Sequence, residues 1–518
     1  MADVYKKLLT LENVSIHSVM ILPPPRAEML NRITKLYYSW DLKHFDKEDE
    51  SMIKFDEFID KSIRVYHLNN DSPESFSSIA SESDSPDFII SLSRMDKSRY
   101  SADLPCPLLQ YETVVRRSYI RSDTIDHFYD IASYKGYTDI GVSMYGTDGF
   151  SRYRIANGFF RPDQKSHTRS IQNIIGSAGQ YFYSACKILS AADEETTFTR
   201  HTVSRPLMPQ IMLLLAYTKV LLRYVKQVIL KKLRISAWGI AFGSYNAEDM
   251  TVNITSEVSG EDAAGCFIAD PFLYKHEGDT YVFYENLGKN NRGEIYSAKY
   301  TDGALTDISE VLKDEIHFSY PLVLPYKDKI YMIPESMAAN QIRLYESEEF
   351  PNKWNLKRVL IDNTAASDST LLCYNNKWWI FTSIAASKGS PTDDNLHIFY
   401  ADDLFSETWT PHPMNPVLTD VRRSRMAGNF ITTGHKIIRP AQDCSKEYGR
   451  TLGLYEIVKL NETEYEEVLY KNGSEILKDC RLLHTINVCD GLAVVDKAVV
   501  RDKLKKRFGV LRFWRKKA

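Results

Sequence analysis

Residues 267–300 read FIADPFLYKHEGDTYVFYENLGKNNRGEIYSAKY, and this stretch decides the fold. It contains three short segments rich in aromatic and β-branched residues, which are separated by two turns rich in Gly, Asn and Asp. Such segments favour β-strands, and such turns favour tight reversals between antiparallel strands. The stretch therefore predicts one blade of a β-propeller.

The same arrangement recurs at residues 317–345 and 366–400, with a period close to the roughly 50 residues of a propeller blade. The spacing inside the copies is constant, because the residue that opens each inner strand is followed eleven residues later by an aromatic residue: Asp270 and Tyr281, Tyr320 and Tyr331, Asp368 and Trp379. Three matches at one spacing indicate a true internal repeat.

Two weaker copies follow, at residues 425–455 and 482–495, and they bring the predicted number of blades to five. Residues 238–258 are expected to supply the strand that closes the ring, because closure removes exposed sheet edges. The sequence therefore predicts an all-β five-bladed propeller over residues 237–498.

Composition excludes several classes of protein. The chain has 518 residues and a formal net charge of −3, which argues against nucleic acid as a partner. Its seven cysteines are scattered, odd in number and without a Cys-x-x-Cys pair, so they indicate reduced thiols in a cytoplasmic protein. The sequence predicts no metal site and no other cofactor.

Residues 15–200 are predicted to form an α/β domain with a Rossmann-like fold. Short apolar runs typical of buried parallel strands occur at residues 18–22, 62–67 and 87–92. Helices are predicted at residues 122–132 and 166–189. No Gly-x-Gly-x-x-Gly follows these strands, so a dinucleotide site is not predicted.

With its strand at residue 87 and its Gly158-Phe159-Phe160 segment, this half resembles the formyltransferase-like domain that precedes such propellers in bacterial proteins. That resemblance implies an Asn, a His and an Asp around a Gly-containing loop. His127 and His167 lie in the middle region, but neither has an Asn-x-His context. We therefore predict the fold without the formyltransferase chemistry.

Residues 205–236 are predicted to form an amphipathic connector helix. Lys219, Arg223, Lys226 and Lys231 recur every three to five residues, which places most of them on one face. These charges argue against a membrane-spanning helix. Two interpretations remain, a helix packed between two domains with a solvated basic face, or an interfacial helix on anionic lipid.

Residues 501–518 form a basic amphipathic tail, in which nine basic residues and one acidic residue are interleaved with Phe508, Phe513 and Trp514. Basic and aromatic side chains together are attracted to an anionic membrane surface. A disordered, solvated tail is the alternative. With the connector helix, this tail makes an anionic membrane surface a candidate partner.

The constant spacing predicts which residues face the central funnel of the propeller, namely Asp270, Tyr320, Asp368, a residue near Gly428, and His484. Carboxylates that face one axis suit sugar chemistry, because one stabilises positive charge at the anomeric carbon and another, with a raised pKa, protonates the leaving oxygen. Glu285 and Glu335, at the ends of the second strands, are candidates for the acid.

Structural interpretations compete with these roles. An Asp before Pro-Phe can cap a turn, a strand-end Glu can pair with Arg343 or Arg439, and a single buried His is usually only hydrogen-bonded. The catalytic residues predicted on balance are Asp270, Glu335 and Asp368. The predicted substrate-binding residues are Glu285, Tyr320, Arg439, Asp443 and His484.

Four motifs carry a more specific resemblance: Ala269-Asp-Pro-Phe-Leu273, Ile330-Tyr-Met-Ile-Pro-Glu335, Phe350-Pro-Asn-Lys-Trp354 and Arg439-Pro-Ala-Gln-Asp443. With them, residues 237–498 resemble the N-terminal propeller domain of the plant glucosamine inositolphosphorylceramide transferase family and its bacterial relatives. That domain is similar in fold to five-bladed glycosidases of the arabinanase and β-xylosidase type. The resemblance implies a five-bladed propeller and a role in glycoconjugates.

Those glycosidases carry a base Asp in the first blade, a pKa-tuning Asp in the second and an acid Glu in the third. Asp270 matches the first of these residues. Tyr320 stands in the second position and Asp368 in the third, so the resemblance does not imply ordinary glycosidase activity.

The resulting hypothesis is a carbohydrate-active protein of bacterial surface-polysaccharide or glycolipid biosynthesis, with glycosyl transfer in the propeller funnel by paired carboxylates. The alternative is a non-catalytic glycan-binding propeller attached to a degenerate or unrelated transferase domain. In both cases the expected ligand is a sugar or glycan. The expected location is the cytoplasm, with peripheral attachment to the inner membrane as a further expectation.

Overall fold

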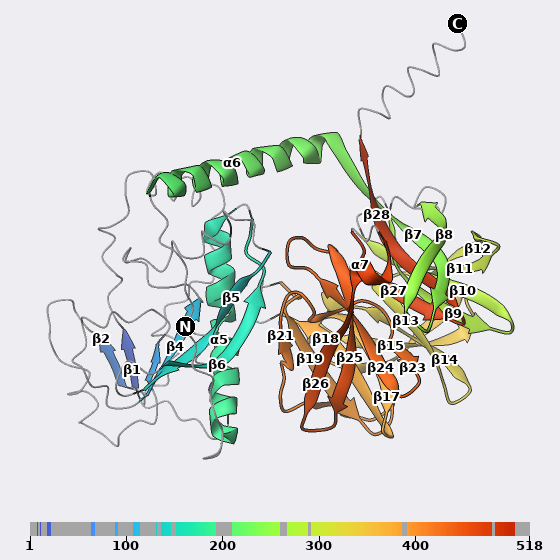
Figure 1. Cartoon of the computed structure of the whole chain (residues 1–518). Helices are drawn as coiled ribbons and strands as arrows, with labels where there is room; N and C mark the ends of the chain where they lie inside the picture. Colours follow the sequence, from blue (N-terminus) through green and yellow to red (C-terminus); the bar gives the residue numbers. More distant parts are fainter. Residues whose placement is uncertain are drawn as a thin grey trace, which may run out of the picture. The chain divides into compact units, whose positions relative to one another are not determined.

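The computed structural model contains two compact units, residues 1–224 with 386–391 and residues 225–385 with 392–518, and each unit is described by itself (Figure 1). In the first unit and the connector, the structure describes residues 8, 11, 18–21, 64–67, 89–91, 107–113, 131, 136–146, 152–164, 166–192 and 210–224. In the second unit it describes residues 225–259, 267–288, 292–385, 392–478 and 482–502, and it also describes residue 391 of the first unit.

Strands of the first unit form two sheets. β1 (Ser18–Ile21) and β2 (Arg64–His67) pair in parallel, as their apolar runs predict. The second sheet has the order β3-β4-β5-β6, with strands Ile89–Ser91, Leu108–Thr113, Thr138–Tyr145 and Arg152–Phe160. In it only β3 and β4 are parallel, whereas β4, β5 and β6 are antiparallel.

This arrangement gives no support to the predicted Rossmann-like, formyltransferase-like domain. A doubly wound fold needs crossover connections of a dozen or more residues between parallel strands. Only residues 146–151 join β5 to β6, so these two strands can pair only as an antiparallel hairpin. The runs predicted as strands at residues 18–22, 62–67 and 87–92 contain β1, β2 and β3, but β4, β5 and β6 were not predicted, and the connectivity of the described strands differs from the predicted fold.

Helix α5 (His167–Ala191) confirms the helix predicted at residues 166–189. Its N-cap is Ser166, whose hydroxyl accepts a hydrogen bond from the backbone amide of Arg169 at 3.2 Å. Ile174 and Phe182 bury their side chains in one core with Leu109 and Ile140 of the sheet. The helix predicted at residues 122–132 lies almost entirely outside the described residues.

The described residues of the second unit contain five antiparallel sheets, which follow the predicted repeats. The first sheet has β9 (Ile268–His276), β10 (Asp279–Leu287), β11 (Gly293–Thr301) and β12 (Ala304–Leu312). The second has β13 (Ser319–Tyr326), β14 (Lys329–Glu335), β15 (Ile342–Glu349) and β16 (Lys353–Ile361). The third has β17 (Ala366–Tyr374), β18 (Lys377–Ile384), β19 (Asn395–Ala401), β20 (Thr410–Pro411) and β21 (Leu418–Thr419).

The two remaining sheets correspond to the weaker copies. The fourth has β22 (Arg425–Met426), β23 (Ile431–Thr433), β24 (Lys436–Asp443), β25 (Thr451–Leu460) and β26 (Tyr465–Asn472). The fifth has the order β27-β28-β7-β8, with strands Ile486–Cys489, Leu492–Asp502, Arg234–Asn246 and Thr251–Ser259. The segment predicted to close the ring, residues 238–258, lies in β7 and β8 of the last sheet beside β28, which continues four residues beyond residue 498.

First strands of the five sheets form a ring. β9 contacts both β13 and β27, and β17 contacts both β13 and β22. The amide of Ile486 donates to the carbonyl of Ala427, which joins the fifth sheet to the fourth. Because the fifth sheet combines strands from both ends of the repeat region, the ring is held together by backbone pairing.

The inner strands share an unusual backbone conformation. Asp270, Tyr320 and Asp368 have φ values of 49°, 49° and 50°, and Gly428 has a φ of 122°. In the first three sheets the strand pairing shifts at this residue, so each of the three lies in a β-bulge. A left-handed conformation outside glycine costs on the order of 1–3 kcal/mol and is concentrated at functional sites. The constant sequence spacing therefore marks a repeated, strained turn toward the centre of the unit.

Helix α6 (Gln210–Leu233) confirms the predicted connector helix and leads directly into β7 (Figure 1). Among the residues that the structure describes, no helix is both long and apolar enough to cross a membrane. The tail that follows β28 lies outside the described residues.

Candidate functional site

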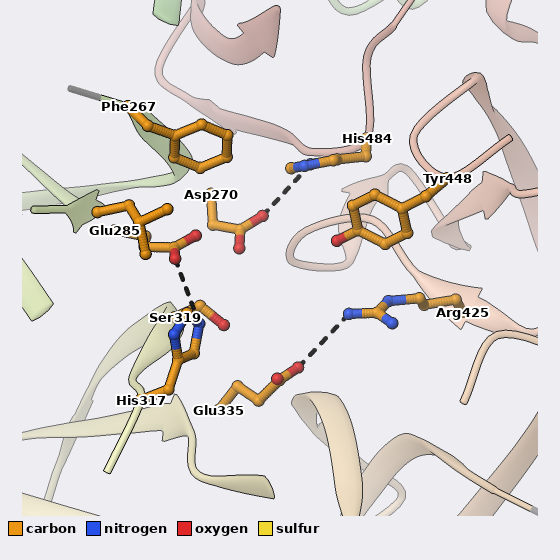
Figure 2. A pocket seen from close by; sticks show the side chains of 10 residues that line it. Phe267, Asp270, Glu285, His317, Ser319, Glu335, Arg425, Tyr448 and His484 are labelled. Carbon is orange, nitrogen blue, oxygen red and sulfur yellow. Dashed lines mark ion pairs between the residues drawn. The ribbon is translucent and has the colours of Figure 1, made fainter. Parts of the chain in front are cut away.

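One cavity of about 440 Å³ opens in the second unit at the level of the strained turns (Figure 2). Its lining comes from four of the five sheets and the loops beside them: Phe267, Asp270, Glu285, Leu287, His317, Ser319, Glu335, Arg425, Tyr448 and His484. This volume lies within the range of small-molecule sites. Four of the eight predicted site residues line it, namely Asp270, Glu285, Glu335 and His484.

Asp270 lies beside an imidazole that is held between two carboxylates. The Nδ1 atom of His484 is in direct contact with Oδ2 of Asp496 and lies 3.4 Å from Oδ1 of Asp270. Oδ1 of Asp270 also accepts a hydrogen bond of 2.7 Å from the hydroxyl of Thr485. All three ionisable side chains are buried, so their charges interact strongly.

This environment moves the pKa values of the pair. Burial raises the pKa of Asp270 to about 7, because the attraction of His484 only partly offsets the lost hydration, and Asp368 and Asp496 add repulsion. Burial also opposes the charge of His484, but the carboxylates of Asp496 and Asp270 outweigh it and raise its pKa to about 9. At neutral pH the imidazole is therefore cationic, and Asp270 is close to its midpoint of titration.

Asp270, His484 and Asp496 also have the residue types of a metal site, with possible ligand atoms within 4.8 Å of one another. Their atoms already have protein partners. Oδ1 of Asp496 accepts the amides of His484 and Thr485 at 2.9 Å each, and Oδ2 accepts the amide of Asp270 at 3.3 Å. The arrangement is better explained as an ion pair that fixes the strained turn at Asp270.

A second carboxyl pair lies across the cavity and shares one guanidinium. Nε and Nη2 of Arg425 donate to the two oxygens of Asp368 at 2.5 and 3.2 Å, and Nη2 lies 3.6 Å from Oε2 of Glu335. Burial and the neighbouring Asp368 raise the pKa of Glu335 well above its usual range, and Arg425 only partly opposes this. The protonated form of Glu335 is therefore favoured, and Arg425 pairs with the carboxylate of Asp368.

Glu335 also has a structural contact. Its Oε2 accepts a hydrogen bond of 3.1 Å from the amide of Asp368, the strained residue of the next sheet. Asp496 makes the equivalent contact with the amide of Asp270. One oxygen of Glu335 is thus used to hold the neighbouring inner strand, which leaves Oε1 as the atom that can carry the proton.

The third carboxyl of the cavity, Glu285, faces a histidine. Nε2 of His317 lies 3.3 Å from its Oε1 (Figure 2). The amide of Gly293 donates to Nδ1 of the same ring at 2.9 Å, so Nδ1 is the acceptor and Nε2 carries the proton. The hydrogen bond to Glu285 raises the pKa of His317.

Aromatic side chains border the same space. His484 stacks on Trp238, with ring centroids 4.3 Å apart, and its ring lies 5.2 Å from that of Tyr448. Arg425 lies 5.1 Å from the Tyr448 centroid. The turn needs glycine at residue 449, because its φ is +63° and an added Cβ would lie 2.9 Å from both Trp238 and His484.

The other four predicted site residues do not line the cavity. Asp368 lies behind Arg425, which covers it. Asp443 accepts the amide of Ser445 at 2.9 Å. Arg439 is fully buried and bonds both oxygens of Glu467 at 2.7 and 2.8 Å. Its guanidinium therefore belongs to the core of the fourth sheet.

Tyr320 is also buried, and its hydroxyl joins three sheets. It bonds the hydroxyl of Thr370 at 2.9 Å, donates to the carbonyl of Gly428 at 3.0 Å and accepts the amide of Gly428 at 2.7 Å. A hydroxyl with these partners has no capacity left for a ligand. Tyr320 thus joins neighbouring sheets by hydrogen bonds, at the position where the glycosidase pattern has the pKa-tuning Asp of the second blade.

Tyr320→Phe is expected to lower the free energy of unfolding by about 1–3 kcal/mol, because it leaves the buried amide of Gly428 without its acceptor. Ligand binding should be unchanged. Urea unfolding followed by tryptophan fluorescence measures the loss. Tyr296→Phe is the matched control, since the Tyr296 hydroxyl makes a long, exposed contact of 3.4 Å to Glu310 and does not join neighbouring sheets through a buried backbone group. Equal stability of the two variants would contradict the assignment.

Sequence reasoning did not assign roles to Arg425, His317, Tyr448 or Asp496. A signal for Asp496 exists in the sequence. In each of the five sheets, the strand that pairs with the inner strand carries a polar residue four positions after a large apolar residue near its start. These polar residues are Glu285, Glu335, Ser383, Gln442 and Asp496. No comparable signal marks Arg425, because its partners Asp368 and Glu335 are distant in sequence and their proximity depends on the ring.

Comparison with solved structures finds similarity to glycosidases. A structure described as RS223-Beta-xylosidase has a TM-score of 0.33 at 14% identity and covers 42% of this chain and 79% of its own. The catalytic domain of a Coprinopsis cinerea GH62 alpha-L-arabinofuranosidase has a TM-score of 0.34 at 12% identity. The match covers 48% of this chain and 82% of that chain.

Closer relatives are found among curated sequences. Glucosamine inositolphosphorylceramide transferase 1 of Oryza sativa subsp. japonica is 37% identical over 221 residues, which are 42% of this chain and 29% of that protein. The protein of the same name from Arabidopsis thaliana is 34% identical over 208 residues, which are 39% of this chain and 27% of that protein. The match thus spans less than a third of the length of these relatives.

A family model described as "Glucosamine inositolphosphorylceramide transferase 1, N-terminal" matches residues 220–482, which is half of the chain. The matched residues begin within α6 and include every cavity-lining residue except His484. The chain therefore belongs to the glucosamine inositolphosphorylceramide transferase 1, N-terminal family.

Proposed function

We propose that the cavity binds a sugar unit and that this protein acts in glycosyl transfer during glycolipid synthesis. The observation that carries the proposal is the convergence of Asp270, Glu285 and Glu335 on one cavity of about 440 Å³. The names of the relatives suggest a hexosamine as the sugar and an inositolphosphoryl lipid as the acceptor. We also infer that the five sheets are the blades of a closed five-bladed propeller.

The protonation states suit this chemistry. A carboxyl with a raised pKa can donate a proton to a leaving oxygen, and burial raises the pKa of Glu335. Asp270, when ionised, can stabilise positive charge at the anomeric carbon or accept a proton from the attacking hydroxyl. Glu285 and His317 are placed to hydrogen-bond sugar hydroxyls.

Tyr448 and Phe267 supply apolar surface beside these polar groups. Both line the cavity, and the Tyr448 side chain is 43% exposed. An aromatic ring offers a flat face to the C–H groups of a pyranose while polar neighbours bond its hydroxyls. The two rings are therefore proposed to set the orientation of the sugar.

A second candidate function is glycan recognition without catalysis. The salt bridges of Arg425 favour it, because they neutralise Asp368 and bring a positive charge to 3.6 Å from Glu335. A carboxylate whose charge is neutralised in this way is a poor base. In this case transfer takes place elsewhere in a longer protein. The predicted cytoplasmic location and the bacterial polysaccharide context stay predictions.

Glu335→Gln separates the two candidates. Loss of a general acid is expected to lower transfer by roughly 10²–10⁴-fold, while binding changes little because Gln keeps the shape and the acceptor for the Asp368 amide. Stability at pH 7.5 should not fall, because burial disfavours the charged form of Glu335 and Gln carries no charge. Transfer of labelled hexosamine from a sugar nucleotide to inositolphosphorylceramide, and calorimetric titration with a hexosamine-containing oligosaccharide, are the measurements.

Glu349→Gln, at the exposed end of β15, is the control and should change neither quantity. If Glu335→Gln retains full transfer, the proposed acid is wrong. If the wild-type chain binds the oligosaccharide but transfers nothing, the recognition function is favoured. If it neither binds nor transfers, both candidates are rejected.

A further inference from the structure

Helix α6 exposes a row of large apolar side chains. Six of its aliphatic residues are between 40% and 63% exposed: Leu215, Leu221, Leu222, Val225, Val228 and Ile229. Spacings of three, four and seven residues place them on one face of the helix. A contiguous exposed face of this kind on a soluble chain usually marks an interaction site.

The opposite side of the same helix packs on protein. Tyr217 and Val220 are buried, with exposures of 7% and 1%. The guanidinium of Arg223 donates to the carbonyl of Ile131 at 2.8 Å. The exposed apolar face is therefore additional to the side through which the helix is held.

Basic residues border the exposed face. Lys219 and Lys226 are exposed and lie three residues before and four residues after Leu222, which puts them along one edge of the apolar row. Lys231 and Lys232 follow near the end of the helix, and α6 contains no Asp or Glu. The surface thus combines aliphatic area with unopposed positive charge.

We propose that this face of α6 lies on an anionic membrane surface. The aliphatic row would enter the boundary between headgroups and acyl chains, and Lys219 and Lys226 would contact lipid phosphates at its edge. Lys219 and Lys226 would hold the helix at the interface, and the basic residues of α6 disfavour a position across the bilayer. A second copy of the helix is a poorer occupant, because two all-basic helices would bring like charges together.

The test uses the full chain and two kinds of large unilamellar vesicles. One kind is pure phosphatidylcholine, and the other contains about a third phosphatidylserine. Co-sedimentation should show binding to the anionic vesicles that weakens as salt is raised. Leu222→Glu/Ile229→Glu should lower the partition coefficient at least about tenfold, and Lys219→Glu/Lys226→Glu should lower it on anionic vesicles in particular. Circular dichroism and thermal melting check that each variant remains folded.

Leu356→Glu/Val458→Glu is the matched control, because these aliphatic side chains are each 49% exposed on β16 and β25. It should bind vesicles as the wild type does. Unchanged binding of both α6 variants would overturn the proposal and would leave the basic tail as the source of binding. A dimer in sedimentation velocity that Leu222→Glu/Ile229→Glu abolishes, without vesicle binding by the wild type, would also overturn it in favour of a second copy.

Discussion

Asp270→Asn is expected to reduce sugar binding or transfer at least about 100-fold and to leave the protein at least as stable as the wild type at pH 7.5. The change removes the charge that the cavity presents beside His484. It keeps the volume of the side chain. Transfer and oligosaccharide titration, as for Glu335, measure the first effect, and thermal melting measures the second.

The local geometry explains why asparagine should be tolerated. Both the hydroxyl of Thr485 and the imidazole of His484 face the same atom, Oδ1 of Asp270, and the amide oxygen of Asn can replace that atom for both partners. Residue 270 has a φ of 49°, a conformation that asparagine adopts more readily than most residues. Alanine lacks both advantages, so Asp270→Ala should be destabilised as well as inactive.

The raised pKa of Asp270 gives the stability effect a definite pH dependence. Between its ordinary value and about 7, the folded protein holds a proton that the unfolded chain has lost, so this carboxyl lowers stability as pH rises through that range. Asn removes the penalty, so the gain in stability of the variant over the wild type should grow from about pH 4 to pH 7 and persist above pH 7.

His484 acts in the opposite direction. Its pKa of about 9 means that its bound proton stabilises the fold fully below about pH 6.5, and that this contribution is lost as pH rises to 9. Asn at residue 270 removes one of its two carboxylate partners, which partly offsets the gain. Melting temperatures of the variant and the wild type should therefore differ least near pH 4 and most toward pH 9, where His484 loses its proton and the offset disappears.

Asp307→Asn provides the control for these measurements, since Asp307 is exposed and has the same φ of 49°. It should alter neither binding nor the pH profile. An Asp270→Asn protein that is active but less stable would show that the carboxylate has only a structural role at the turn. Asp270 would then be removed from the proposed site.

Arg439→Met is expected to lower the free energy of unfolding of the second unit by about 3–5 kcal/mol, the largest stability effect that we predict. The guanidinium bonds both oxygens of Glu467 and the carbonyl of Arg423, and neither side chain of the Arg439–Glu467 pair is exposed. Its removal leaves the buried Glu467 carboxylate with the hydroxyl of Tyr465 at 2.6 Å and the guanidinium of Arg423 at the longer distance of 3.6 Å. Urea unfolding of the full chain measures the change.

A double variant identifies the cause. Arg439→Met/Glu467→Met removes both charges, and it should recover much of the lost stability because the desolvated carboxylate is gone. Lys436→Met, on the same strand, is the control, since its pair with Glu456 is exposed and should contribute at most about 1 kcal/mol. If Arg439→Met is stable but fails to bind the oligosaccharide, Arg439 acts on the ligand as first predicted from the sequence.

The sequence alone determined the repeat and its inner positions. Asp270 and Asp368 are each followed eleven residues later by an aromatic residue. This spacing arises from a strand, a turn and a second strand, which are local features determined by residues close together in the chain. The structure adds that Asp270 and Asp368 occupy strained bulges. The helices α5 and α6 were likewise predictable, because amphipathic spacing is a local property.

Only the tertiary structure decided which side chains share the site. Arg425 reaches Asp368 across 57 residues, and His484 reaches Asp270 across more than 200, so their contacts depend on how the ring of sheets closes. For the same reason Arg439 and Tyr320, which carry suitable chemistry in sequence, are directed into the core and bonded there. The order of strands in the first unit was also decided by the tertiary structure. A short apolar run predicts a strand, but the same run occurs in parallel and in antiparallel strands, so it does not specify how the strand pairs.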